Sequence, residues 1–115
     1  MKIKYSTMIV KDMNESVKFY TDTMGFKIDS EHYPPNAKIT LLKGEGDTLL
    51  ELIQDDKNKI GLYSIGMAVE NMDSAVRELK LKGVEFILEP TKISIGLMAM
   101  FKDPNDINIV LIHHD

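Results

Sequence analysis

The sequence predicts an α+β fold in which the order strand, helix, strand, strand, strand occurs twice. The first observation is a repeated phrase: VKDMNESVKFYTDTMGF (10–26) is matched by VENMDSAVRELKLKGVEF (69–86), and each phrase reads as strand end, turn, amphipathic helix and glycine. The second is that three strand-like segments follow each phrase. The third is the polar segment QDDKNKIG (54–61), which lies between the two halves. We therefore expect an internal duplication.

The two predicted helices carry similar start and stop signals. Asn14 is the N-cap candidate of the first helix, and Asp73 is that of the second. Gly25 and Gly83 fit the left-handed backbone position at which a helix ends. The apolar stripe of each helix follows helical spacing: Val17, Tyr20 and Met24 in the first, Val76, Leu79 and Leu81 in the second.

The strand-like segments set the predicted boundaries. They are FKIDSE, AKITLLKG and DTLLELIQ in the first half, and VEFIL, ISIGLMAMFK and INIVLIHH in the second. Pro34 and Pro35 separate strands in the first half, and Pro90 does so in the second. We expect a single domain over 1–115, with one module at 1–56 and the other at 61–115.

Composition excludes several classes of function. The net charge of -4 disfavours binding to phosphate backbones, so we expect no nucleic-acid partner. With no cysteine among the 115 residues, disulfides and thiolate chemistry are excluded. No apolar run approaches the roughly 18 residues that a membrane span needs, so we expect no membrane partner and a cytoplasmic protein.

Several short motifs resemble those of the vicinal oxygen chelate superfamily, the glyoxalase/bleomycin-resistance/dioxygenase family. They are Val10-Lys11-Asp12-Met13, Phe19-Tyr20, Met24-Gly25-Phe26 and Lys102-Asp103-Pro104-Asn105, and the resemblance covers almost the whole chain. It implies two βαβββ modules that form a curved mixed-sheet cup, in a homodimer. The cup of such proteins holds a small-molecule ligand and, in metal-dependent members, one divalent ion.

Strand alternation indicates which residues face the cup and which face a helix. Bulky residues such as Met8, Leu52, Met67 and Leu111 suit the helix side. The opposite parity gives the predicted ligand-binding set: Tyr5, Thr7, Ile9, Leu49, Glu51, Ser64, Gly66, Asn108 and Val110. Met98 and Met100 share one face of their strand, and alternation alone does not decide whether that face is the helix side or the cup side.

The resemblance implies four metal-ligand positions, and they fall on Tyr5, Glu51, Ser64 and Val110. Only Glu51 has a side chain that the family uses there, and valine has no lone pair to offer. The histidines do not supply the missing metal ligands. We expect His32 in a loop, and His113 and His114 in an exposed tail. We therefore expect no metal cofactor. Isoleucine at position 9 replaces a basic residue of glutathione-using relatives, which further disfavours the glyoxalase I reaction.

Glu51 is the residue on which the functional hypotheses depend. It is a candidate general base, but it is also compatible with a solvated side chain or with a structural hydrogen bond to Tyr5. The favoured hypothesis is metal-independent binding of a small, partly apolar molecule. The alternatives are a lyase, isomerase or dioxygenase-like enzyme that uses Glu51 as base or a depleted metal site, and a small regulatory or accessory dimeric module.

Overall fold

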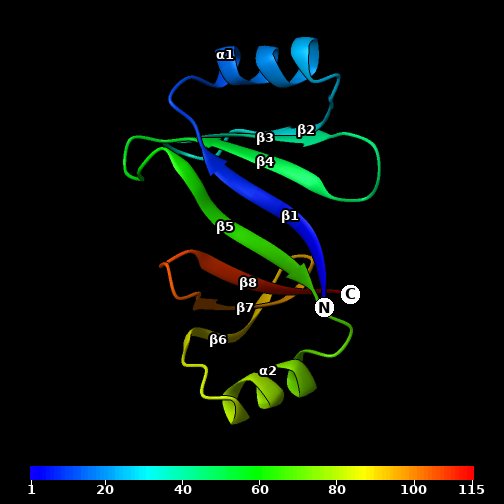
Figure 1. The fold of residues 1–115 in the computed structure, drawn as a ribbon, viewed down its shortest axis with the longest axis vertical. Coiled ribbons are helices and arrows are strands. Elements are labelled where there is room, and N and C mark those ends of the chain that lie inside the picture. The colour runs from blue at the N-terminus through cyan, green and yellow to red at the C-terminus, as the bar shows by residue number, and fades with distance from the viewer. The chain divides into compact units, whose positions relative to one another are not determined.

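The computed structural model describes all of residues 1–115, and the chain runs twice through the order strand, helix, strand, strand, strand (Figure 1). The elements are β1 (Lys2–Ile9), α1 (Met13–Lys18), the π-helical turn η1 (Phe19–Thr23), β2 (Lys27–His32), β3 (Lys38–Lys43), β4 (Leu49–Gln54), β5 (Gly61–Ala68), α2 (Met72–Leu81), β6 (Phe86–Ile93), β7 (Gly96–Lys102) and β8 (Asn108–His114). The predicted α+β class and element order are confirmed. Neither helix has the length and apolarity that crossing a membrane requires.

The chain divides into two compact units. The N-terminal unit is Lys4–Tyr63, and the C-terminal unit is Ser64–Asp115 together with Met1–Ile3. In the N-terminal unit β1 is parallel to β4, β4 is antiparallel to β3, and β3 is antiparallel to β2. In the C-terminal unit β5, β8, β7 and β6 pair in the same order and with the same directions. This shared pairing is what an internal duplication predicts.

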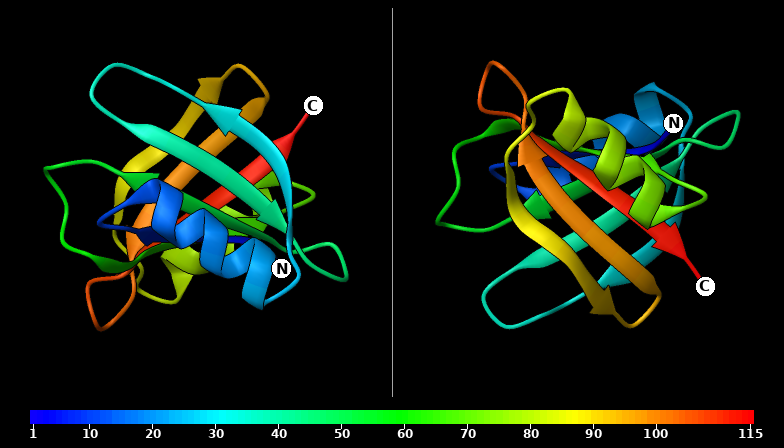
Figure 2. Two further views of the ribbon diagram at one scale, coloured as in Figure 1. Left: turned by 90° about the horizontal axis from the view of Figure 1, so that it is seen from above. Right: turned by 90° about the horizontal axis from the view of Figure 1, so that it is seen from below.

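Each unit packs its helix on one face of its own sheet (Figure 2). In the N-terminal unit Met13, Leu42 and Leu52 are buried, and the partly buried residues around them are Met8, Val10, Val17, Tyr20, Phe26 and Leu50. Met8 and Leu52 therefore lie on the helix side, as the alternation predicts. Burial of one such leucine contributes about 1.5–3 kcal/mol.

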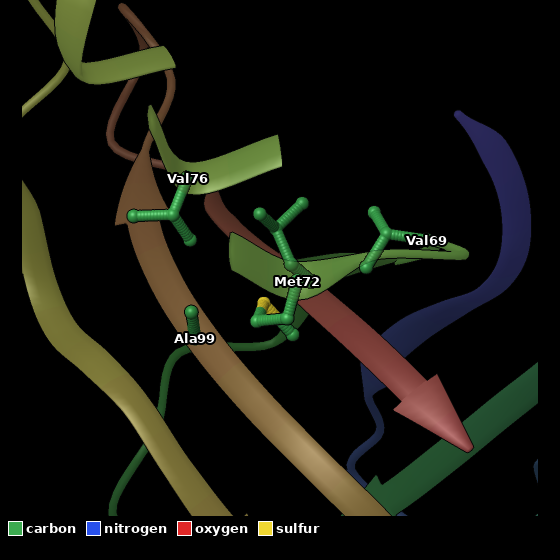
Figure 3. Close-up of a cluster of buried hydrophobic side chains, with 5 residues drawn as sticks. Val69, Met72, Val76 and Ala99 are labelled. Carbon is green, nitrogen blue, oxygen red and sulfur yellow. The ribbon is translucent and has the colours of Figure 1, made fainter. Parts of the chain in front are cut away.

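The core of the C-terminal unit is built in the same way. Figure 3 shows Val69, Met72, Val76 and Ala99 close together between α2 and the sheet. The partly buried residues that pack on this core include Met67, Leu97, Phe101 and Ile109. The prediction that Met67 and Leu111 lie on the helix side is confirmed.

The helix caps differ from the prediction. Asp12, not Asn14, caps α1: its Oδ1 accepts a hydrogen bond from the Glu15 amide at 3.0 Å. Asn71, not Asp73, caps α2 through the same bond to the Ser74 amide, also at 3.0 Å. Both helices therefore start two residues earlier than predicted. In each case a residue that can cap a helix lies two positions before the predicted cap, and it is this earlier residue that accepts the hydrogen bond.

The predicted helix stops are confirmed. Gly25 follows η1 with φ +78°, and Gly83 follows α2 with φ +94°. At the second stop the Val84 amide donates to the Leu79 carbonyl over 3.0 Å, which closes the helix end. Before Gly25 the helix widens, since the Met24 amide donates to the Phe19 carbonyl five residues back, at 3.3 Å.

Candidate functional site

The candidate site lies on the face of the N-terminal sheet that is opposite α1, which we call the helix-free face. Strand register places Tyr5 beside Leu49 and Thr7 beside Glu51 in the parallel pair β1 and β4. Glu51 also stands opposite Leu41 of β3. Since directly paired residues share a face of a sheet, all five predicted residues of this unit (Tyr5, Thr7, Ile9, Leu49 and Glu51) lie on the helix-free face.

Thr7 and Glu51 form the polar centre of this face. The Thr7 hydroxyl Oγ1 donates to Glu51 Oε1 over 2.6 Å, a short bond of the kind formed to a charged acceptor. Thr7 is only 1% exposed, so its rotamer is held by packing. The sequence left open a structural hydrogen bond from Tyr5 to Glu51; the protein donor is Thr7 instead.

One oxygen of Glu51 stays available. The Thr7 bond uses Oε1, and no other protein group donates to this carboxylate. No buried side-chain oxygen in residues 1–115 lacks a partner, so Oε2 must be accessible rather than sealed in the core. Glu51 can therefore accept a hydrogen bond from a group outside the protein.

Tyr5 adds a proton donor next to this acceptor. Burial, and secondly the negative charge of Glu51, raise the pKa of the Tyr5 phenol to about 12. The phenol is thus neutral at any physiological pH and carries its proton. A donor and an acceptor therefore lie on adjacent strands of one face.

Apolar side chains surround the polar centre. Ile53 pairs with Ile9 on one side and with Ile39 on the other, and Leu41 pairs with Glu51 itself. Ile9 is 2% exposed, and Leu49, Leu41 and Ile53 are half-buried. Ile39 and Leu41 were absent from the predicted set. The alternation of ITLL in β3, read together with the antiparallel pairing to β4, is the signal that could have found them.

The other predicted residues lie on the equivalent face of the C-terminal sheet. Ser64 pairs with Asn108, and Gly66 pairs with Val110, in the parallel pair β5 and β8. All four are buried. Because the alternate residues Met67 and Leu111 pack under α2, these four face away from it, as predicted. Their predicted convergence with Tyr5 and Glu51 stays a prediction.

The structure also answers the question about the methionines of β7. Met98 pairs with Ile112, and Met100 pairs with Val110. Phe101, the next residue, packs in the α2 core. Met98 and Met100 therefore lie on the face opposite α2, where they widen the apolar surface around Val110.

The donor set does not fit a divalent metal ion of the kind that the family resemblance implies. In residues 1–115 no three His, Asp or Glu side chains come together. Glu51 contributes one carboxylate, while Val110 has no donor atom at all. All three histidines lie in strands rather than in the predicted loop and tail, with His114 as the last residue of β8. His32 ends β2, and His113 in β8 has its Nδ1 3.1 Å from the Val69 carbonyl oxygen.

Two sizeable cavities lie beside rather than over the Thr7–Glu51 pair. One, of about 710 Å³, is lined by Ser6 of β1, by the residues just after η1, including Phe26, and by the start of β4, including Leu49. The other, of about 680 Å³, adjoins the start of α2 and includes Met1, Asn71 and Glu78. Neither is lined by Glu51.

Comparison with known proteins gives a family match over nearly the whole chain. The model of the Glyoxalase/Bleomycin resistance protein/Dioxygenase superfamily matches residues 2–111. Uncharacterized protein YurT of Bacillus subtilis is 31% identical, over 90% of this chain and 91% of its own length. Human mitochondrial methylmalonyl-CoA epimerase is 25% identical, over 96% of this chain and 71% of its own. A probable lactoylglutathione lyase of Synechocystis is 29% identical, over 92% and 91%.

Solved structures share the fold. A hypothetical protein, BH1468 from Bacillus halodurans, superposes with a TM-score of 0.82 at 19% identity, over 99% of this chain and 94% of that one. Methylmalonyl-CoA epimerase from Mycobacterium tuberculosis superposes with a TM-score of 0.80 at 17% identity, over 99% and 88%. At these identities the likeness concerns the fold alone.

Proposed function

The chain belongs to the Glyoxalase/Bleomycin resistance protein/Dioxygenase superfamily, and from that premise we propose that it binds a small, partly apolar molecule on the helix-free face without a metal ion. The bond from Thr7 to Glu51 carries this proposal. It fixes a carboxylate among isoleucine and leucine side chains and leaves one of its oxygens accessible. A few placed polar groups in an apolar surround are typical of small-molecule sites.

The metal-independent part of the proposal rests on donor chemistry. Glu51 and Tyr5 are the only residues of the predicted ligand set on this face with ionisable oxygens. A single carboxylate and a neutral phenol are too few strong donors to hold zinc, nickel or iron tightly. The ligand must then be held by hydrogen bonds and apolar contact.

A second candidate function is proton transfer. An epimerase and a probable lyase are among the similar proteins, so an enzyme is plausible for this chain. Glu51 would accept a proton from the substrate as general base, and the neutral Tyr5 phenol would donate a hydrogen bond to the oxygen on which charge develops. The arrangement offers no nucleophile paired with a base, so we propose no covalent intermediate.

One series of measurements tests metal-independent binding. Protein purified without chelator is analysed for metals and then screened by thermal shift against apolar compounds that carry hydrogen-bonding groups. Metal-independent binding predicts no stoichiometric metal and a rise in Tm with ligand; a compound at a hundredfold excess over its Kd stabilises by about 2.7 kcal/mol. Stoichiometric zinc, nickel, manganese or iron would contradict the proposal.

A variant then distinguishes binding from catalysis. Glu51→Gln keeps the size of the side chain but removes the charge and the ability to accept a proton. If the protein only binds, a ligand identified in the screen loses affinity with this variant. If it is a proton-transfer enzyme, exchange of the ligand's carbon-bound proton with deuterated solvent occurs with the native protein and stops with the variant.

We further propose that the protein is a cytoplasmic homodimer, as the family resemblance implies. Size-exclusion chromatography with light scattering measures the mass directly. A mass of 13.1 kDa, that of one chain, at micromolar concentration would contradict the dimer.

A further inference from the structure

The two oxygens of Glu51 have different environments, and this difference bears on the class of ligand. Oε1 accepts the Thr7 hydroxyl at 2.6 Å. A hydroxyl has a single proton to donate, so Thr7 has none left for a ligand. Because Thr7 is 1% exposed, it has no surface to offer a ligand either. Thr7 is therefore a positioning residue for Glu51 rather than the ligand contact that the sequence predicts.

The charge of Glu51 is not neutralised by a neighbour. The hydrogen bond that Glu51 accepts comes from a neutral hydroxyl, not from a cation. The nearest cationic side chain by register on this face is Lys43, which pairs with Leu49 at the far end of β4 and is exposed to solvent. The immediate neighbours of the carboxylate on the face are Thr7 and Leu41. A carboxylate in this position attracts a cation and repels an anion more strongly than it would in water.

Resting on the proposed function, we infer that this site selects ligands whose apolar body carries a hydrogen-bond donor, with amines preferred over alcohols and carboxylates rejected. Glu51 Oε2 accepts from the ligand's donor group, and Thr7 holds the carboxylate so that this oxygen is presented. Tyr5 donates to an acceptor on the same ligand where one is present. Leu49 and Ile53, which are half-buried, contact its apolar body.

Three probes of nearly equal size separate this inference from general apolar binding. Benzylamine, benzyl alcohol and benzoate are titrated at pH 7 into ¹⁵N-labelled protein, and the amide resonances of Leu49, Glu51 and Ile53 are followed. We expect benzylamine to bind at least tenfold more tightly than benzoate, with benzyl alcohol between them.

Variants assign the preference to its residues. Glu51→Gln should reduce benzylamine affinity to within threefold of benzyl alcohol while the spectrum stays dispersed. Thr7→Val, which removes the hydroxyl at nearly constant size, should weaken benzylamine binding several-fold. The matched control Thr7→Ser keeps the hydroxyl and should bind within twofold of the native protein.

The outcomes distinguish the inference from the function on which it rests. Benzoate binding as tightly as benzylamine, with shifts at these three residues, overturns the charge preference but leaves small-molecule binding on this face intact. Equal binding by Thr7→Val and the native protein overturns the positioning role of Thr7. Shifts at none of the three residues with any probe overturn both the inference and the proposed function.

Discussion

Asp12 and Asn71 are the N-caps of α1 and α2, and they form equivalent hydrogen bonds. Each side-chain oxygen accepts a hydrogen bond from the backbone amide three residues later, and both bonds are 3.0 Å long. The two residues are also equivalent when the repeated phrases of the sequence are aligned on Val10 and Val69. The repeat thus extends from the order of elements to the atoms that start each helix.

Replacing a true cap should destabilise the protein, whereas replacing the false candidate should not. Asp12→Ala and Asn71→Ala each leave a first-turn amide without its acceptor and should lower the free energy of unfolding by about 1 kcal/mol. Asn14→Ala and Asp73→Ala are the matched controls and should change it by less than about 0.5 kcal/mol. Urea unfolding measures all four. A larger loss for Asn14→Ala than for Asp12→Ala would contradict the assignment.

Gly96 should tolerate no side chain. Its φ is +150°, and a Cβ placed there would overlap the backbone carbonyl of His113, which cannot move without disturbing the pairing of β7 with β8. We expect Gly96→Ala to lower the free energy of unfolding by about 3 kcal/mol or more.

Gly46 provides the control for this experiment. It also has positive φ, at +92°, but no atom lies within 4 Å of a Cβ built there. Gly46→Ala should therefore cost only about 1 kcal/mol, the penalty of the backbone conformation. Equal losses for the two variants in a chemical denaturation experiment would show that the close approach to His113 has no energetic effect.

The bond between Thr7 and Glu51 should appear as a coupling energy. In a double-mutant cycle with Thr7→Val and Glu51→Leu, the double variant should be more stable than the sum of the single losses predicts, by about 1–2 kcal/mol. The reason is that each single change leaves one polar partner unsatisfied. Additive losses would mean that the bond contributes nothing to stability.

Tyr5 should make stability fall at alkaline pH. Its pKa is raised to about 12 in the folded protein, whereas that of an unfolded tyrosine is about 10. Below pH ~10 both states hold the proton and the contribution is fully present; between about 10 and 12 only the folded state holds it, so stability is lost as the pH rises.

The magnitude is modest because solvent still reaches part of the ring. We expect Tyr5 to account for a loss of about 1–2 kcal/mol between pH 9.5 and 11.5. Tyr5→Phe, which lacks the phenol, is the control, since lysines and the other tyrosines also titrate in this range. Parallel stability curves for the two proteins over that range would contradict the prediction.

The fold class was predictable because the helical spacing and the strand alternation both place apolar residues on one side of each element. Alternation placed Met8, Leu52, Met67 and Leu111 on the helix side, and the structure has each of them there. The repeated order of elements was predicted as well, whereas the pairing of the strands in each unit was not. Burial of apolar faces is the main driving force, so the pattern that reports burial also reports the fold.

Local choices between similar residues were not predictable in the same way. Asp12 and Asn14 are both good caps, and a difference of two residues changes no hydrophobic pattern. Which donor reaches Glu51 depends on strand register, because a shift of the β1–β4 pair would exchange Thr7 for another residue. The face of Met98 and Met100 became clear only when Phe101 was placed against α2.

The irregular pairing of the two outer strands, β2 with β3 and β6 with β7, has a further consequence. Each is the outer strand of its sheet, and each carries an irregular register: β2 between Ile28 and Ser30, and β6 between Phe86 and Leu88 and again before Thr91. A bulged strand presents its free amides and carbonyls out of line, and Pro90 removes one amide altogether. Neighbouring molecules in a crowded solution therefore find no straight template on which to extend the sheet, which protects the protein from aggregation through its own strands.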